Sequence, residues 1–253
     1  MLTSENTLPI SDKKKHTTAL SSAIRLDDRL TAAADFVRSG VRIADIGSDH
    51  AYLPIYLVQT GRCHSAVATD IRKGPLKAAE EHIVKYKLNG RISLFQANGL
   101  RGIERFAPDD IFLCGMGGEL IATILNESSY IRCAEIHLIL QPMTMQSYLR
   151  KWLAAEGFRI HKEKLAAANG KIYPVLLASY DSIHRTFTEA EYLLGAYTIQ
   201  NRSLPELKNL FPLLLENRIQ TFRKIADGKK RAGKDTRYEE QILSELLPLR
   251  RTK

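Results

Sequence analysis

The feature that most constrains the fold is a regular alternation of short β-rich runs and helical stretches from about Ser21 to Tyr180. Such an alternation predicts an α/β fold with a mainly parallel, buried sheet. The expected strands cover residues 41–46, 65–70, 91–96, 110–114, 136–141, 158–166 and 172–180. The expected helices cover residues 26–39, 52–60, 74–88, 117–127 and 144–156. Asn169-Gly170 joins the last two strands and is a strong hairpin signal, so this pair is expected to be antiparallel.

After about Ser182 the strands stop and the pattern becomes helical. Apolar side chains recur at helical spacing at Leu207, Phe211, Leu215, Ile219, Phe222 and Ile225. Pro205 suits a first helical turn, whereas Pro212 is expected to kink the helix or divide it in two. A further amphipathic helix is expected over "RYEEQILSELLPLR". We therefore divide the chain into a disordered lead-in (1–20), an α/β domain (21–182) and a helical domain (183–253).

The totals exclude several classes of protein. No apolar run approaches the roughly 18 residues that a membrane helix needs, and the N-terminus lacks the apolar core of a signal peptide. Cys63, Cys114 and Cys133 are widely separated and show no metal-ligand spacing, so we expect no metal site. Cys114 and Cys133 lie in or beside apolar runs and are expected to be buried free thiols. We expect a reduced, cytoplasmic protein with no membrane partner.

The chain is strongly basic, with a formal net charge of +9. Such an excess favours polyanionic partners, although it also fits a merely soluble basic surface. Many of the cations fall in one stretch that contains only Asp227 and Asp235 as acids. The stretch holds Arg218, Arg223, Lys224, Lys229, Lys230, Arg231, Lys234 and Arg237. We interpret it as either a solvated face or a face that contacts RNA.

The loop after the first expected strand, in "RIADIGSDHAYLP", has the strongest chemical character. It carries one glycine, Gly47, followed by Ser48 and His50, and two carboxylates, Asp45 and Asp49. A dinucleotide fingerprint needs three glycines, and a carboxylate beside a pyrophosphate is unfavourable. S-adenosylmethionine has no phosphate; its sulfonium and ammonium groups favour nearby carboxylates. Capping of the turn and of the next helix is the structural alternative for the two acids.

Other expected strands end in residues of the same kind. Asp70, at the end of the second strand, is suited to bind two ribose hydroxyls. Nicotinamide cofactors and S-adenosylmethionine both have such a ribose, so Asp70 does not discriminate between them. The third strand leads to Asn98-Gly99, beside a bound adenine or in a simple turn. The fourth leads to "CGMGGELI", where Gly115, Gly117 and Gly118 open a helix and let a ligand approach the backbone. Gln141 in "QPM" ends the fifth and could read a base edge. This agreement among strand ends indicates one ligand-binding rim.

These motifs identify a resemblance. The motifs "ADIGSDHAYLP", "ATDIRKGPL", "NGL", "CGMGGELI" and "ILQPM" resemble the bacterial tRNA adenine-22 N1-methyltransferases over about Arg25 to Tyr180. A helical, coiled-coil-like C-terminal domain is also similar to that family's layout. The chain departs from the family at Asn98, where Asp is usual, and in "LDDRL", which puts the role of Asp27 and Asp28 in doubt. The resemblance implies a Rossmann-like class I methyltransferase with a seven-stranded sheet. It implies S-adenosylmethionine as cofactor, held by Asp45, Gly47, Ser48, Asp49, His50, Asp70, Ile71, Asn98, Gly99, Gly115 and Met116.

The resemblance also implies methylation of N1 of adenine 22 in the D-arm region of tRNA. Adenine N1 has an in-plane lone pair, so alignment with the methyl group matters more than a general base. Candidate catalytic residues are Asp27, which could stabilise positive charge, Arg29, which could hold a phosphate, Gly117, and Tyr173, which could stack on the base. Another S-adenosylmethionine-dependent RNA methyltransferase, a non-catalytic RNA-binding protein with this fold, and a nicotinamide-dependent oxidoreductase are the alternatives. The basic C-terminal helices are expected to contact tRNA.

Overall fold

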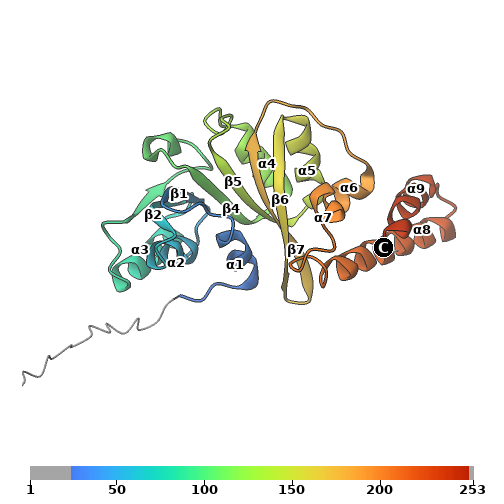
Figure 1. The fold of residues 1–253 in the computed structure, drawn as a ribbon, viewed down its shortest axis with the longest axis horizontal. Coiled ribbons are helices and arrows are strands. Elements are labelled where there is room, and N and C mark those ends of the chain that lie inside the picture. Colours follow the sequence, from blue (N-terminus) through green and yellow to red (C-terminus); the bar gives the residue numbers. More distant parts are fainter. Residues whose placement is uncertain (1–23, 251–253) are drawn as a thin grey trace, which may run out of the picture.

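A seven-stranded sheet forms the centre of the molecule in the computed structural model, which describes residues 24–250 (Figure 1). The strands are β1 (Val41–Ile46), β2 (Cys63–Asp70), β3 (Ile92–Gln96), β4 (Asp110–Gly117), β5 (His137–Thr144), β6 (Phe158–Ala168) and β7 (Lys171–Tyr180). Their order across the sheet is β3-β2-β1-β4-β5-β7-β6. Strands β1 to β5 pair in parallel, whereas β7 runs antiparallel to both β5 and β6. The predicted α/β class and the antiparallel final hairpin are confirmed.

Helices cover both faces of the sheet, and a further group lies beyond its β6 edge (Figure 1). They are α1 (Asp28–Ala34), α2 (Tyr52–Gln59), α3 (Lys73–Lys85), α4 (Gly118–Asn126), α5 (Gln146–Ala155), α6 (Glu189–Leu194), α7 (Ala196–Gln200), α8 (Phe211–Arg231) and α9 (Arg237–Leu246), with short 3-10 helices η1 (Ile103–Phe106) and η2 (Leu247–Arg250). Within residues 24–250 no helix is both long enough and apolar enough to span a bilayer.

The strands alternate their side chains between two hydrophobic cores. Ile43 and Phe112 belong to the core under α1, α2 and α3, whereas Ala44 and Leu113 belong to the core under α4 and α5. This alternation follows from the period of two in a strand, and burial on both faces explains why the central strands are almost wholly apolar. The parallel strands therefore present their carboxyl ends together at one edge of the sheet, which we call the rim.

Two helices begin at the rim after a residue with left-handed backbone. Ala51 (φ 56°) precedes α2 and Met145 (φ 52°) precedes α5, and neither supplies a side-chain cap. Gly118 begins α4 directly against Met145, because a Cβ at Gly118 would lie 2.3 Å from the Met145 carbonyl oxygen. The starts of α4 and α5 are thus in contact beside the end of β4.

The C-terminal helices, which we call the helical region (189–250), share a third core with the β6–β7 hairpin. Leu165 of β6 packs there with side chains from α6, α8 and α9. The long helix of this region begins later than predicted. Residues 201–210 form turns, so the predicted helix start at Pro205 is wrong. Helix α8 begins at Phe211 with Pro212 in its first turn, so the predicted kink at Pro212 is wrong as well. A proline in the first turn removes no helical hydrogen bond, which explains why α8 runs unbroken to Arg231.

Other boundaries also moved. The first helix is shorter than the predicted 26–39, since α1 ends at Ala34. Strand β4 continues to Gly117 and β5 to Thr144, so Gly115 and Gly117 belong to a strand end and only Gly118 opens the helix. Helices α6 and α7 were not predicted. The predicted lead-in over 1–20 lies outside the described residues, and the domain division at 182/183 stays a prediction.

Candidate active site

A cavity of about 430 Å³ opens at the rim, where β1 and β4 end. Three segments line it: the start of α1, the loop between β1 and α2, and the end of β4. Its lining residues are Asp27, Arg29, Leu30, Asp45, Gly47, Ser48, Asp49, His50, Ala51, Tyr52, Leu53, Cys114 and Gly115. Eight of the predicted site residues therefore meet in one cavity: Asp27, Arg29, Asp45, Gly47, Ser48, Asp49, His50 and Gly115.

Asp45 is the chemically unusual member of the cavity. Burial raises the pKa of its carboxyl group to about 6, and the neighbouring Ser48 hydroxyl lowers it only in part. No cation among residues 24–250 forms an ion pair with Asp45. The loop that holds it is tied to β2, because the Ser48 N–H donates to the Thr69 carbonyl oxygen at 2.7 Å. A buried carboxylate without a cationic partner is costly, so this position suits a positively charged ligand.

The loop is closely packed at its single glycine. Gly47 has a φ of 73°, and a Cβ there would lie 2.2 Å from the Met116 methyl carbon, so both its backbone and its surroundings favour glycine. Met116 itself is the β4 residue against which the loop rests. On the β4 wall, burial and the charge of Asp45 raise the pKa of the Cys114 thiol, so this wall is uncharged at neutral pH.

The exposed half of the loop carries Asp49 and His50. Asp49 is 66 % exposed and its Oδ2 lies 3.2 Å from His50 Nε2. It does not cap α2, because Ala51 occupies the N-cap position and no side chain bonds to it. The Tyr52 ring stacks on His50 and on His82, whereas the His50 and His82 rings are tilted, and the three centroids lie 5.1–5.6 Å apart. His50 and Tyr52 therefore give the cavity an aromatic wall, with His82 behind it.

The predicted ribose and adenine residues lie at the ends of β2 and β3. Asp70 is buried, and its Oδ1 accepts a hydrogen bond of 2.8 Å from the Arg72 N–H. Ile71 is 57 % exposed. Asn98 and Gly99 follow β3, whose last residue, Gln96, pairs with Asp70. Asp70, Ile71, Asn98 and Gly99 share the rim with the cavity but are not in its lining, and their cofactor roles stay predictions.

Arg29 of α1 connects the cavity to β5 and β7. Its Nη1 donates to Gln141 Oε1 at 3.3 Å and contacts Met143 Sδ at 2.9 Å, and its guanidinium lies 5.8 Å from the centre of the Tyr173 ring. Gln141 Oε1 also accepts from the Gly115 N–H at 3.2 Å. The Arg29 side chain thus links α1 directly to β5 and β7, and through Gln141 to β4. Sequence reasoning missed this link, although a glutamine within the apolar run "ILQPM" was a signal for it.

Asp27 lies beside Arg29 and caps α1. Its Oδ1 accepts from the Leu30 N–H at 2.9 Å, and its Oδ2 pairs with Arg29 at 2.5 Å. Burial opposes ionisation of Asp27, but these hydrogen bonds outweigh it and lower the pKa of the carboxyl group. Asp27 is therefore a partly exposed carboxylate that stays ionised at neutral pH.

Two of the polar candidates are less accessible than expected. Tyr173 is only 6 % exposed and lies under Arg29, and Gln141 is fully buried with its oxygen used by Arg29 and Gly115. Gly117 lies where β4 gives way to α4. The roles predicted for Gly117 and Tyr173 stay predictions.

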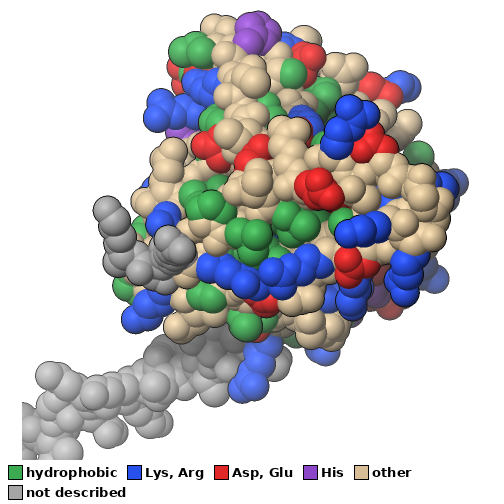
Figure 2. All heavy atoms as spheres, turned by 90° about the vertical axis from the view of Figure 1, so that its right-hand side faces the viewer, with side chains coloured by type: hydrophobic (Ala, Val, Ile, Leu, Met, Phe, Trp, Pro, Cys, Tyr) green, Lys and Arg blue, Asp and Glu red, His purple; other side chains and the backbone are tan. Residues whose placement is uncertain are grey.

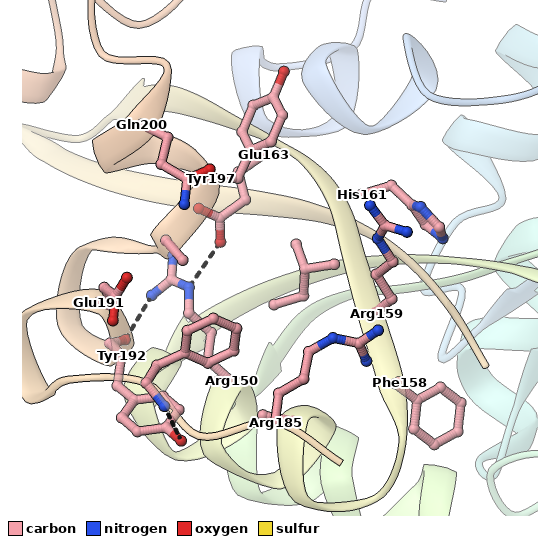
Figure 3. A pocket seen from close by; sticks show the side chains of 14 residues that line it. Arg150, Phe158, Arg159, His161, Glu163, Arg185, Glu191, Tyr192, Tyr197 and Gln200 are labelled. Carbon is pink, nitrogen blue, oxygen red and sulfur yellow. Dashed lines mark hydrogen bonds and ion pairs between the residues drawn. The ribbon is translucent and has the colours of Figure 1, made fainter. Parts of the chain in front are cut away.

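A second cavity, of about 220 Å³, lies away from these residues, between α5, β6 and the segment that includes α6 and α7 (Figure 3). Its main polar feature is an ion pair between two buried side chains, Arg150 and Glu163. Across the described part of the chain, no three His, Cys, Asp or Glu side chains are grouped to hold a metal ion.

Comparisons with known proteins agree on one class. Residues 26–176 match a family described as "Methyltransferase domain". The tRNA (adenine(22)-N(1))-methyltransferase of Bacillus subtilis is 34 % identical over 230 residues, which cover 88 % of this chain and 93 % of that protein.

Solved structures of similar length match as well. The B. subtilis M1A22 tRNA methyltransferase TrmK has a TM-score of 0.73 and 32 % identity, over 90 % of this chain and 96 % of that one. TrmK of M. capricolum in complex with the cofactor product S-adenosyl-homocysteine has a TM-score of 0.71 and 27 % identity, over 89 % of this chain and 96 % of that one.

Proposed function

This chain belongs to the tRNA (adenine-22-N1)-methyltransferase family, and we infer that it transfers the methyl group of S-adenosylmethionine to N1 of adenine 22 in tRNA. The Rossmann-like methyltransferase fold and the cofactor class predicted from the sequence motifs are confirmed. The observation that carries the proposal within this molecule is Asp45, a buried carboxylate at the rim that has no ion-pair partner in the described part of the chain. S-adenosylmethionine supplies the missing positive charge and the electrophilic methyl group.

The same cavity argues against the nicotinamide alternative. Asp45 and Asp49 flank a loop with one glycine, and both line the cavity. Among the residues that line the cavity, a diphosphate would meet the carboxylates of Asp45 and Asp49, and the one arginine there, Arg29, is already paired with Asp27. A ligand with an ammonium and a sulfonium group meets complementary charge instead. We assign Asp45, Ser48 and Asp49 to the amino-acid end of the cofactor, and Asp70 to its ribose.

We place the entering adenine beside Arg29, which lines the cavity at the start of α1. We propose that Arg29 does not bind a phosphate but holds Gln141, which in turn holds the Gly115 N–H at the methyl-donor side of the rim. Asp27 is ionised and 43 % exposed at its side chain, but its ion pair with Arg29 offsets its charge, so we assign it only a secondary part in stabilising the positive charge that N1 methylation creates on adenine. Since adenine N1 needs no base to remove a proton, alignment provides most of the rate.

The helical region is the proposed tRNA-binding part. Several of its cations have no ion pair among residues 24–250: Arg223, Lys224, Lys230, Arg231 and Lys234. Lys229 and Arg237, by contrast, pair with Glu239 and Asp235. Figure 2 shows Lys and Arg side chains beside hydrophobic ones on the face that looks out from this end of the molecule. A tRNA substrate also implies that the protein works in the cytoplasm.

The decisive experiment uses the purified protein with S-adenosylmethionine and an unmodified tRNA transcript. Mass-spectrometric mapping is expected to place 1-methyladenosine at position 22, and a transcript with guanine at position 22 is the matched control. A methyl group at another nucleotide would favour a different RNA methyltransferase. Cofactor binding without methyl transfer to any tRNA would favour the non-catalytic alternative.

A further inference from the structure

One side chain of the basic stretch in α8 is directed inward and not toward solvent. Arg218 is partly buried, and its Nη2 donates to Gln146 Oε1, in the first turn of α5, at 3.1 Å. Burial, together with the charge of Arg150, lowers the pKa of the Arg218 guanidinium. Its Nε is buried and has no hydrogen-bond partner among residues 24–250. Arg218 is therefore poorly placed to contact RNA, and another reason is needed for a cation at this position.

The hydrogen bond to Gln146 continues to the rim. Gln146 Nε2 donates to the Met143 carbonyl oxygen at 3.1 Å. The Met143 side chain contacts Arg29, whose other partners are Asp27 and Gln141. A chain of polar contacts thus runs from the helical region, through the start of α5, to the residues that face the incoming base.

Helix α5 holds the helical region at a second point on the same side. Arg150 is four residues after Gln146, so the two side chains lie on one face of the helix. Arg150 Nε donates to Glu163 Oε1 at 2.7 Å and its Nη1 donates to the Tyr192 carbonyl oxygen at 3.1 Å (Figure 3). Glu163 Oε2 in turn accepts from the Thr198 hydroxyl at 2.5 Å. Arg150 fixes α6 and α7 against β6, and Gln146 fixes α8 against the rim.

We propose that the Arg218–Gln146 pair is a positioning device, which sets the register between the helical region and the methyl-transfer site. The proposal rests on the proposed function, in which tRNA is held by the helical region while adenine 22 enters the rim. A reaction that depends on alignment loses about 100-fold in rate for a displacement of about 1 Å. A hydrogen bond between α8 and the first turn of α5 controls the displacement that matters, because α5 begins only three residues after Met143, whose side chain contacts Arg29.

The test separates the rate of transfer from affinity. In Arg218→Met the guanidinium is lost while the apolar stem is largely kept. We expect the single-turnover rate of methyl transfer at saturating tRNA to fall by at least about 10-fold. The dissociation constants for tRNA and for S-adenosylmethionine should stay within about threefold of wild type. Arg223→Met, on an exposed turn of the same helix, should show the opposite pattern: weaker tRNA binding with the saturated rate preserved.

Further variants test the pair itself. Gln146→Leu should lower the saturated rate as Arg218→Met does, and the double variant should be no slower than either single variant, because the two side chains act as one unit. Arg218→Lys keeps a donor for Gln146 Oε1 and should recover most of the rate. If Arg218→Met does not fold, Gln146→Leu and Arg218→Lys still decide the question.

The outcomes are distinguishable from failure of the proposed function. A wild-type protein that methylates no adenine 22 refutes the proposed function. A wild-type protein that is active, with Arg218→Met or Gln146→Leu unchanged in saturated rate, refutes the positioning role alone. Independent, multiplicative losses in the double variant, or a loss confined to tRNA affinity, also overturn it.

Discussion

Replacing Asp45 by asparagine should stabilise the ligand-free protein at neutral pH and at the same time weaken its binding of S-adenosylmethionine. Burial raises the pKa of the Asp45 carboxyl group from its ordinary 3.8 to about 6. At neutral pH the folded protein therefore contains a carboxylate that would be more stable in water. Asparagine has nearly the same shape and carries no charge, so it removes this cost.

The size of the effect follows from the pKa. A difference of one pKa unit is worth about 1.4 kcal/mol, so the step from 3.8 to about 6 corresponds to about 3 kcal/mol. The folded-state pKa is the higher one, so the stability that Asp45 contributes is complete below 3.8 and is lost as the pH rises through 6. The advantage of Asp45→Asn should thus be full above pH 6 and should disappear as the pH falls toward 4. For a chain of this length it corresponds to about 6 to 12 °C in Tm.

The assay is thermal unfolding of ligand-free protein between pH 4.5 and 8, together with calorimetric titration of S-adenosylmethionine. Loss of the Asp45 charge should lower the affinity for S-adenosylmethionine by about 10- to 100-fold. In the wild type the affinity should fall as the pH drops below 6, because protonation removes the carboxylate, and in Asp45→Asn this dependence should be absent. Asp49→Asn, an exposed carboxylate of the same loop, is the control and should change Tm little.

One result would refute the reasoning directly. If Asp45→Asn is no more stable than the wild type at pH 8 and binds S-adenosylmethionine with unchanged affinity, the Asp45 charge is not destabilised by burial and is not a partner of the cofactor. A stabilised variant with full cofactor affinity would retain the electrostatic argument but remove the assignment of Asp45 to the cofactor.

Four further perturbations test other parts of the structure. Asp70→Asn keeps an oxygen that accepts the hydrogen bond from the Arg72 N–H, but it should lower the calorimetric affinity for S-adenosylmethionine at least about 10-fold. Unchanged affinity would contradict the assignment of Asp70 to the ribose. Gly195→Ala should destabilise the protein by more than about 2 kcal/mol in denaturant unfolding, because φ is 94° and the new Cβ would lie 1.7 Å from a carboxylate oxygen of β6. Gly228→Ala, in open space within α8, should instead stabilise by about 0.5–1 kcal/mol. Replacing Lys230 and Arg231 by alanine should weaken tRNA binding and flatten its salt dependence without affecting the cofactor, and an equal loss of both would contradict the division of labour.

The fold was predictable where the pattern is long and local. Alternating strands and helices predicted the parallel sheet, and Asn169-Gly170 predicted its antiparallel end. Helices α6 and α7 have only six and five residues, which is too short for a periodic signal. The start of α8 was misplaced because the turns over 201–210 also bring apolar side chains such as Leu207 into the core.

The sequence predicts the parts of the site that are formed by residues close to one another in the chain, but not the contacts between distant segments. The loop around Gly47 could be interpreted from neighbouring residues, since its chemistry depends on acids within two positions of the glycine. The contact between Arg29 and Gln141 joins residues 112 positions apart, so no local pattern contains it. In the same way, a run of cations does not reveal that Arg218 turns inward while Arg223 stays exposed. The difference depends on the contact between Arg218 and Gln146 of α5, which is distant in the sequence.

Ala51 has a consequence for how such loops are recognised. It adopts a left-handed conformation that glycine reaches at no steric cost, and its methyl group is completely buried. The backbone path of a glycine-rich turn is therefore available to a loop that has alanine at this position, provided that the surrounding core compensates. Searches that count glycines will overlook relatives built in this way, whereas a search for the path itself will find them.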